Sequence, residues 1–294
     1  MMTQHQSVLT AEVLSAIEPK SDGVYLDATF GGGGHSRALL EATAPTGRVI
    51  GIDLDESVQP FAEKLASEYP GRFRFEALSY VATEKLGEEF DGVIMDLGLS
   101  TDQLESSFPT QSSSASPQKS SGRGFSFQKT NEPLDLRFNS ASGQTAAEFL
   151  RQAPLPRIEQ VFRDYAEDRY WRRLSAKIVE TRRRNLIRTV GDFISLVGNS
   201  DPKVLAPLFQ GLRIEVNHEL DNLKRGLQVI SGLLKTSGYL AVISFHSLED
   251  RIVKEFFRES ELEVITKKPV LPSDEEVSRN PRSRSAKLRV AKRR

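Results

Sequence analysis

Four consecutive glycines, Gly31 to Gly34, follow a short apolar stretch and precede His35 in the segment DATFGGGGHS (residues 27–36). Glycine loses more backbone entropy on folding than any other residue, so a run of four is unfavourable inside a helix or strand. A tight turn would need only one of them. The run therefore indicates a place where bare backbone is required because a ligand approaches it closely.

Strand-like and helix-like segments alternate around this run. We expect strands at 23–30, 47–55, 72–77 and 90–98, and helices at 35–43 and 56–69. This alternation is typical of an α/β fold with a parallel sheet covered on both faces. The glycine run then lies at the carboxyl end of the first strand, where open α/β sheets bind their ligands.

The middle of the chain has a different character. Residues 106–122 hold eight serines and one charge, which is too little apolar surface for a folded core. A charged helical pattern covers about 144–200, and α/β character resumes after 206, with one long helix expected at 209–238 and a strongly apolar strand at 239–245. We therefore predict a sheet domain built from 1–104 and 205–294. Between these parts lies an inserted helical substrate-recognition domain, 105–204, which carries the Ser-rich loop 106–122.

Composition excludes several classes of protein. The absence of cysteine rules out disulfides, thiolate catalysis and cysteine zinc sites, and it fits a cytoplasmic protein. We find neither a signal-peptide pattern nor an apolar stretch long enough to span a membrane. The 40 Lys and Arg balance the 40 Asp and Glu, but residues 279–294 carry eight basic side chains and no acid. This C-terminal tail is a local basic patch or a solvated chain end.

The glycine spacing limits the class of ligand. A dinucleotide fingerprint requires Gly-x-Gly-x-x-Gly or Ala, and counting from Gly31 its third position is Ser36. The phosphate-loop pattern is also absent. A nucleoside-type cofactor without a pyrophosphate remains, of which S-adenosylmethionine is the obvious case. Asp53 closes the second strand 20 residues after Gly33, where an acid can accept hydrogen bonds from both ribose hydroxyls. Asp55 is the better N-cap for the following helix.

Three more side chains follow strands and are candidate site residues. Tyr80 lies against an adenine or packs into the core, and Asp96 stands where a substrate meets the cofactor. His246 follows the strand 239–245 and faces the same crevice, or it belongs to a capping cluster with Ser247 as N-cap. No cluster of His, Asp and Glu has the spacing of a metal site.

Several long segments resemble the ribosomal RNA small subunit methyltransferase H family, also called MraW. They include HQSVLTAEVL, DATFGGGGHS, DGVIMDLGLSTDQL, PLDLRF, FQGLRIEVNHEL and GYLAVISFHSLEDRIVK. The resemblance covers nearly the whole chain except the Ser-rich loop. It implies a Rossmann-like S-adenosylmethionine-dependent methyltransferase sheet with an inserted helical domain. It also implies N4-methylation of a cytosine in 16S rRNA near the ribosomal P site. We expect the assembled small subunit as the partner, with naked rRNA as the alternative substrate, and both a monomer and a homodimer stay open.

Residue by residue, the resemblance implies a set of cofactor contacts: Gly33, Gly34, His35, Asp53, Tyr80, Asp96 and Gln103. The chain departs from the family pattern in three places, of which one, PLDLRF in place of PLDMRM, is conservative. The loop after Gln103 is longer than expected, and KVLAPL (203–208) stands where HPATRT is expected. The His, Arg and Thr of that stretch are therefore missing.

The implied reaction needs a few further groups. The exocyclic amine of cytosine is a weak nucleophile, so positioning it in line with the methyl group is the main task. Asp96 is the first candidate to accept one amine N–H, or it contacts the cofactor alone, and His246 contacts base or backbone. Phe125 and Phe127 supply a stacking surface for the base or pack into the core.

Basic segments point to RNA phosphates. The segments RYWRR (169–173) and TRRRN (181–185) and the C-terminal tail provide Arg172, Arg183 and Arg284, or else these are solvated surfaces. Two alternatives to an rRNA (cytosine-N4-)-methyltransferase remain. One is a cofactor-binding ribosome assembly factor without catalysis, and the other is an amino-methyltransferase acting on another nucleic acid.

Overall fold

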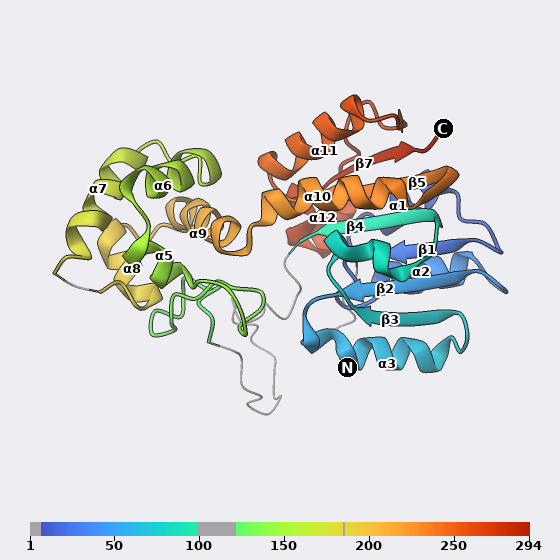
Figure 1. Ribbon diagram of the computed structural model, residues 1–294, viewed down its shortest axis with the longest axis horizontal. Coiled ribbons are helices and arrows are strands. Elements are labelled where there is room, and N and C mark those ends of the chain that lie inside the picture. Colours follow the sequence, from blue (N-terminus) through green and yellow to red (C-terminus); the bar gives the residue numbers. More distant parts are fainter. Residues whose placement is uncertain (1–6, 99–121, 185) are drawn as a thin grey trace. The chain divides into compact units, whose positions relative to one another are not determined.

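The computed structural model describes residues 7–98, 122–184 and 186–294 (Figure 1). Two compact units make up the chain. Met1–Gly98 and Leu220–Arg294 form the first, and Leu99–Glu219 form the second. Gln103 and nearly all of the Ser-rich loop lie outside the described residues.

A mixed sheet forms the centre of the first unit (Figure 1). Within the described residues it has seven strands in the order β3-β2-β1-β4-β5-β7-β6. The strands are β1 (Val24–Asp27), β2 (Arg48–Asp53), β3 (Phe73–Ala77), β4 (Phe90–Leu97), β5 (Leu234–Ser244), β6 (Glu263–Val264) and β7 (Lys287–Lys292). The first five are parallel, whereas β7 is antiparallel to both β5 and β6. The predicted α/β fold is confirmed.

Helices cover both faces of this sheet. They are α1 (Thr10–Ile17), α2 (Gly34–Ala42), α3 (Gln59–Glu68), α10 (Glu219–Gly232), α11 (Ser247–Glu259) and α12 (Asp274–Arg279), with 3₁₀ turns η1 (Glu56–Val58), η2 (Tyr80–Leu86) and η4 (Pro281–Ser285). Neighbouring strand residues divide between two cores because side chains alternate along a strand. Val49 packs with residues of α1, α2 and α3, while Ile50 packs with residues of α10 and α11.

Phe30 fills the space that two glycines leave open. A Cβ on Gly33 would lie 2.8 Å from the Phe30 ring, and a Cβ on Gly51 in β2 would lie 2.6 Å from it. The ring is buried between Phe73 and Phe75, with centroid distances of 5.5 and 5.3 Å. It therefore has little room to move aside. Gly33 and Gly51 are required by packing within the protein itself.

The second unit is helical around its own core. Its helices are α5 (Ala146–Gln152), α6 (Leu155–Gln160), α7 (Trp171–Thr181), α8 (Val190–Val197) and α9 (Pro202–Asn217), and a π-helical turn, η3 (Val161–Tyr165), follows α6. Phe193 stands at the centre of the core, stacked on Phe162 and edge-on to Phe209. Among the described residues of both units, no helix is long and apolar enough to cross a membrane.

The single long helix predicted at 209–238 is wrong. Helix α9 ends at Asn217, and His218 takes a left-handed conformation with φ of 53° before α10 begins. Helix α10 then ends at Gly232, and β5 already starts at Leu234. The apolar period runs on through the break, so the pattern gives no sign of it. This break falls where the second unit gives way to the first.

Replacing Gly51 tests the packing around Phe30. We predict that Gly51→Ala lowers the free energy of unfolding by about 1–3 kcal/mol, because the added methyl group overpacks a buried ring. The control is Gly232→Ala at the exposed end of α10, where an added Cβ meets nothing within 4 Å. Denaturant unfolding measures both variants, and equal stability of the two would contradict the packing described here.

Candidate functional site

Three acids end adjacent parallel strands. Asp27 is the last residue of β1, Asp53 is the last residue of β2, and Asp96 is the last residue but one of β4. Since β2, β1 and β4 are neighbours with the same direction, these acids reach one edge of the sheet. That edge is the carboxyl end of the strands, where α/β sheets place their ligands.

The glycine run links β1 to α2 at this edge. Gly31 and Gly33 have φ of 48° and 75°, in the left-handed region that favours glycine. A Cβ on Gly34 would overlap Ser7 Oγ, so this glycine too is required by a protein neighbour. Helix α2 begins at Gly34, and its N-cap, Gly33, gives no side-chain hydrogen bond. The N–H groups of its first turn are of the kind that bind polar ligand groups.

Asp53 ties the glycine run to the end of β2. Its Oδ2 accepts a hydrogen bond from Gly31 N–H at 2.9 Å, and its Oδ1 accepts one from Asp55 N–H at 2.9 Å. Burial raises the pKa of the Asp53 carboxyl above its ordinary value, although these hydrogen bonds lower it in part. Each carboxylate oxygen has a second lone pair, so both can accept another hydrogen bond. Asp55 accepts from Ser57 N–H at 3.0 Å and so caps η1, whereas the N-cap of α3 is Val58 and not the predicted Asp55.

Asp27 is a buried acid next to the run. The Ser36 hydroxyl donates to its Oδ2 at 2.7 Å, and Thr29 N–H donates to Oδ1 at 3.4 Å. Burial raises the pKa of the Asp27 carboxyl, while the charge of His35 and the Ser36 hydroxyl lower it less. The sequence shows Asp27 and Ser36 nine residues apart. Only the folded loop brings them together, so the pattern alone gave no signal for this pair.

His35 and Asp96 face each other across the site. His35 Nε2 lies 3.4 Å from Asp96 Oδ2, and the imidazole is only 4% exposed. Asp96 N–H donates to Thr29 Oγ1 at 2.6 Å, which fixes the backbone at the end of β4. Both ring nitrogens of His35 and the Oδ1 atom of Asp96 are buried without a hydrogen-bond partner among the described residues. Such atoms are uncommon in folded proteins and mark a place for a further polar group.

Tyr80 opens η2 after β3 and is half-buried. Its ring packs against helix α10, because a Cβ on Gly226 would lie 2.6 Å from Tyr80 Cε2. The ring also adjoins the core on that face of the sheet. Much of the ring is therefore in contact with protein, and whether an adenine covers the rest stays a prediction.

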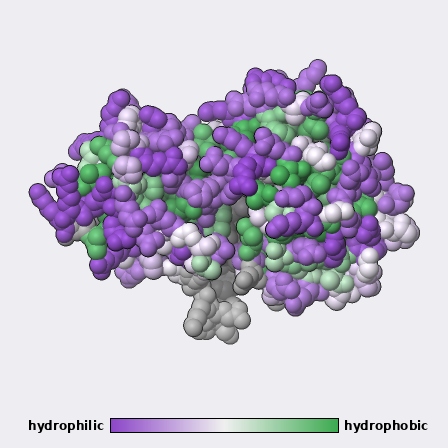
Figure 2. Space-filling view, viewed as in Figure 1, coloured by the Kyte–Doolittle hydropathy of each residue, from purple (hydrophilic) through white to green (hydrophobic). Residues whose placement is uncertain are grey.

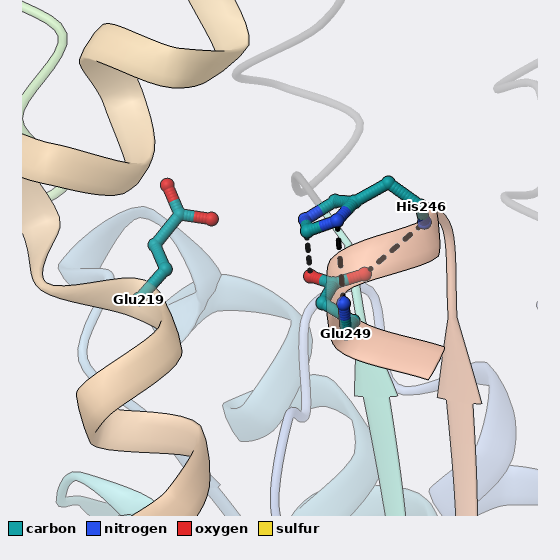
Figure 3. A group of neighbouring side chains, drawn as sticks. All are labelled: Glu219, His246 and Glu249. Carbon is teal, nitrogen blue, oxygen red and sulfur yellow. Dashed lines mark hydrogen bonds and ion pairs between the residues drawn. The ribbon is translucent and has the colours of Figure 1, made fainter. Parts of the chain in front are cut away.

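His246 caps helix α11, so the prediction of Ser247 as N-cap is wrong by one residue. Its Nδ1 accepts from Glu249 N–H at 3.4 Å, and Glu249 Oε2 accepts from His246 N–H at 3.3 Å (Figure 3). His246 Nε2 lies 3.2 Å from Glu249 Oε1. Glu219, also drawn, belongs to the second unit, where Arg213 donates to both of its carboxylate oxygens at 2.8 and 3.0 Å. The imidazole of His246 thus has a structural role in the first unit.

The candidate RNA residues lie on both units. Phe125 and Phe127 are half-buried and pack against the core of the second unit, and Phe127 is 6.1 Å from Phe209. This packing matches the core alternative for both rings. Arg172 and Arg183 are exposed in and after α7, and Arg284 is exposed in η4 of the first unit.

Comparison with known proteins identifies the relatives of this chain. The family model of the MraW methylase family matches residues 2–294. The chain is 41% identical to the ribosomal RNA small subunit methyltransferase H of Thermomicrobium roseum, covering 100% of this chain and 94% of that protein. It is 40% identical to the protein of the same name from Kosmotoga olearia, covering 98% and 97%.

A solved structure, a putative rRNA-methylase from Clostridium thermocellum, matches 97% of both chains with 12% identity and a TM-score of 0.45. At this level of similarity the fold assignment depends on the strand order of the sheet itself.

Ser36→Ala tests the burial of Asp27. We predict a loss of about 1.5–3 kcal/mol in the free energy of unfolding at pH 7, since a buried carboxylate loses its short hydrogen bond. The folded-state pKa of Asp27 is raised, so the carboxyl is protonated as the pH falls through that value, and the loss becomes smaller. Ser67→Ala, on the exposed side of α3, is the matched control. A loss independent of pH, or equal in both variants, would contradict a buried carboxylate at Asp27.

Proposed function

Because this chain belongs to the MraW methylase family, we propose that it transfers a methyl group from S-adenosylmethionine to N4 of a cytosine in 16S rRNA, near the P site of the small ribosomal subunit. The observation that carries the proposal is the family match over residues 2–294 together with the three acids at one sheet edge. Relatives that are named ribosomal RNA small subunit methyltransferase H, such as those at 41% and 40% identity, support an rRNA substrate. We propose the assembled subunit as that substrate, and a cytoplasmic location.

The sheet edge fits S-adenosylmethionine, the methyl donor of this family. Asp53 offers one remaining lone pair on each oxygen to the two ribose hydroxyls, and it is held in place by two backbone N–H groups. The uncapped start of α2 gives N–H donors beside it. Asp96 Oδ1 is buried and has no hydrogen-bond partner among the described residues. Gly33, Gly34 and His35 line the same turn, and we propose that they contact the donor through their backbone.

Bound S-adenosylmethionine supplies a methyl group already activated on a sulfonium. The protein must then orient the cytosine amine, whose lone pair is delocalised into the ring. We assign this task to Asp96, whose Oδ1 accepts one N–H of the amine, so that the lone pair points away from the acceptor and toward the methyl group. The same carboxylate can act as the general base that accepts the proton lost by the amine on methylation. His246, tied to Glu249 as a cap, holds the start of α11 beside this edge.

The second unit offers a surface for RNA. The Arg172 guanidinium lies 4.3 Å from the centroid of the Trp171 ring, and the Arg163 guanidinium lies 5.5 Å from it. Tyr170, which precedes Trp171 in the sequence, is 65% exposed, and the Arg169 guanidinium lies 5.8 Å from the centroid of its ring. Hydrophilic side chains predominate at the α7 end of this unit (Figure 2, left). Arginines beside the exposed Tyr170 ring and the half-buried Trp171 ring suit a ribose-phosphate chain with unstacked bases.

Product analysis tests the proposed function. The purified chain is incubated with isotope-labelled S-adenosylmethionine and either unmodified small subunits or naked 16S rRNA, and the digested nucleosides are identified by mass spectrometry. We expect labelled N4-methylcytidine at one position, with assembled subunits the better substrate. Donor binding without any methylated nucleoside would instead support an assembly factor. A different methylated nucleoside would contradict the assignment to N4 of cytosine.

Asp53→Ala tests the ribose contact. We predict that affinity for S-adenosylhomocysteine falls at least about tenfold by calorimetry, since hydrogen bonds to a charged group contribute about 1.5–3 kcal/mol. Asp192→Ala is the matched control, because Asp192 likewise accepts two backbone N–H groups, at 2.9 Å each, but in the second unit. Equal affinity of Asp53→Ala and Asp192→Ala would remove Asp53 from the donor site.

Arg172→Ala combined with Arg183→Ala tests the RNA surface. Loss of two phosphate contacts should weaken binding to small subunits and reduce the slope of log K against log salt by about 1.4–1.8. The control is Arg258→Ala, an exposed arginine of α11 that pairs with Glu259 at 2.9 Å. An unchanged salt slope in the double variant would show that the α7 end does not contact RNA.

A further inference from the structure

A buried histidine lies among the acids of the site. His35 stands in the first turn of α2, and its imidazole is 4% exposed. Asp96 on β4, Asp27 on β1 and Glu276 on α12 are the charged groups that act on it. The proposed contacts with S-adenosylmethionine use the His35 backbone. They therefore assign no role to the imidazole ring.

The ring is directed at Asp96. Its Nε2 lies 3.4 Å from Asp96 Oδ2, which is within ion-pair distance but outside hydrogen-bond geometry. Of the two Asp96 oxygens, Oδ2 therefore faces the imidazole, and Oδ1 is the buried one without a partner among the residues described. Hydrogen bonds in active sites are often long in the free protein and tighten when ligands bind.

The charges around the ring favour its protonated form. Burial by itself lowers the pKa of His35, but the adjoining Asp96 carboxylate, and then the charges of Asp27 and Glu276, raise it further than burial lowers it. The net shift is upward from the ordinary value of 6.5. An imidazolium here also offsets the effect of the Asp96 charge on Asp27, whose pKa that charge raises.

We propose that His35 is a positioning residue, whose imidazole ring holds Asp96 Oδ2 and so keeps Oδ1 toward the substrate amine. This inference rests on the proposed function, because it takes Asp96 as the acceptor of the amine N–H. The ring does not touch the methyl donor. The ring acts through Asp96. Asp96 Oδ2 contacts the imidazole, and Oδ1 is left for the substrate amine.

Nitrogen NMR of the whole chain tests the pairing without any substrate. The chain has four histidines, so a ¹⁵N-histidine sample gives few signals, and single substitutions assign them. We expect His35 to titrate above its ordinary value of 6.5, because the Asp96 carboxylate favours the protonated ring. In Asp96→Asn its pKa should fall by about one unit or more, as for loss of an adjacent opposite charge. The backbone amide spectrum away from the site should stay unchanged and reports that the fold is intact.

Either of two NMR results would overturn the pairing. One is a His35 ring that titrates below 6.5 in the unaltered chain. The other is a His35 titration that Asp96→Asn leaves in place. Because the unaltered chain alone decides the first, a poorly folded variant does not remove the test.

Kinetics of two variants separate positioning from donor binding. His35→Leu removes the ring N–H that would donate a hydrogen bond to Asp96. We expect kcat to fall at least about tenfold, while the Kd for S-adenosylhomocysteine changes less than about twofold. His35→Gln, which keeps an N–H group, should recover part of kcat. In the unaltered enzyme kcat should fall as the pH rises through the His35 pKa found by NMR, and this limb should be missing in His35→Gln.

Two kinetic results would contradict the positioning role. If both variants lose donor affinity, the ring is a cofactor contact, and if both keep the full kcat, the ring is structural. If the chain yields no N4-methylcytidine, the proposed function is refuted instead. The NMR experiment still tests the His35–Asp96 pairing in that case, because it needs no substrate.

Discussion

Parallel pairing of β2, β1 and β4 places the carboxylates of Asp53, Asp27 and Asp96 at one edge of the sheet. The other residues of the site stabilise these three acids. Removing carboxylates from water is costly unless each receives hydrogen bonds or an opposite charge. The chain gives each acid a different partner. Asp53 receives backbone N–H groups, Asp27 receives the Ser36 hydroxyl, and Asp96 faces His35.

These different partners give the acids different roles. The N–H groups of Gly31 and Asp55 each donate a hydrogen bond to one oxygen of Asp53 and hold the carboxylate in place. Asp53 is therefore a rigid acceptor with a second lone pair on each oxygen. Asp27 is enclosed and has no exposed surface, which suits a structural anchor for the turn into α2. Asp96 is 20% exposed and has a buried oxygen without a partner in the described part of the chain, so it is the acid best placed to meet a substrate.

The sequence predicts the sheet and its ligand edge because alternation and strand-end acids are local signals. It does not predict contacts that depend on how loops close. The glycine run was attributed to a ligand, yet Gly33 and Gly34 also make room for Phe30 and Ser7. The cap of α11 falls on His246 because β5 ends at Ser244, a boundary that the apolar pattern does not fix. The sequence pattern does not predict the break between α9 and α10 at His218, because the apolar period continues across it.

Amide NMR during a titration with S-adenosylhomocysteine tests the central claim most directly, because it locates the ligand on the chain. We predict saturable binding of one molecule, with the largest shifts at the amides of Gly31, Asp53 and Asp96 and of the first turn of α2. Saturable binding that leaves these amides unmoved and shifts signals elsewhere, or no binding at all, would contradict this prediction.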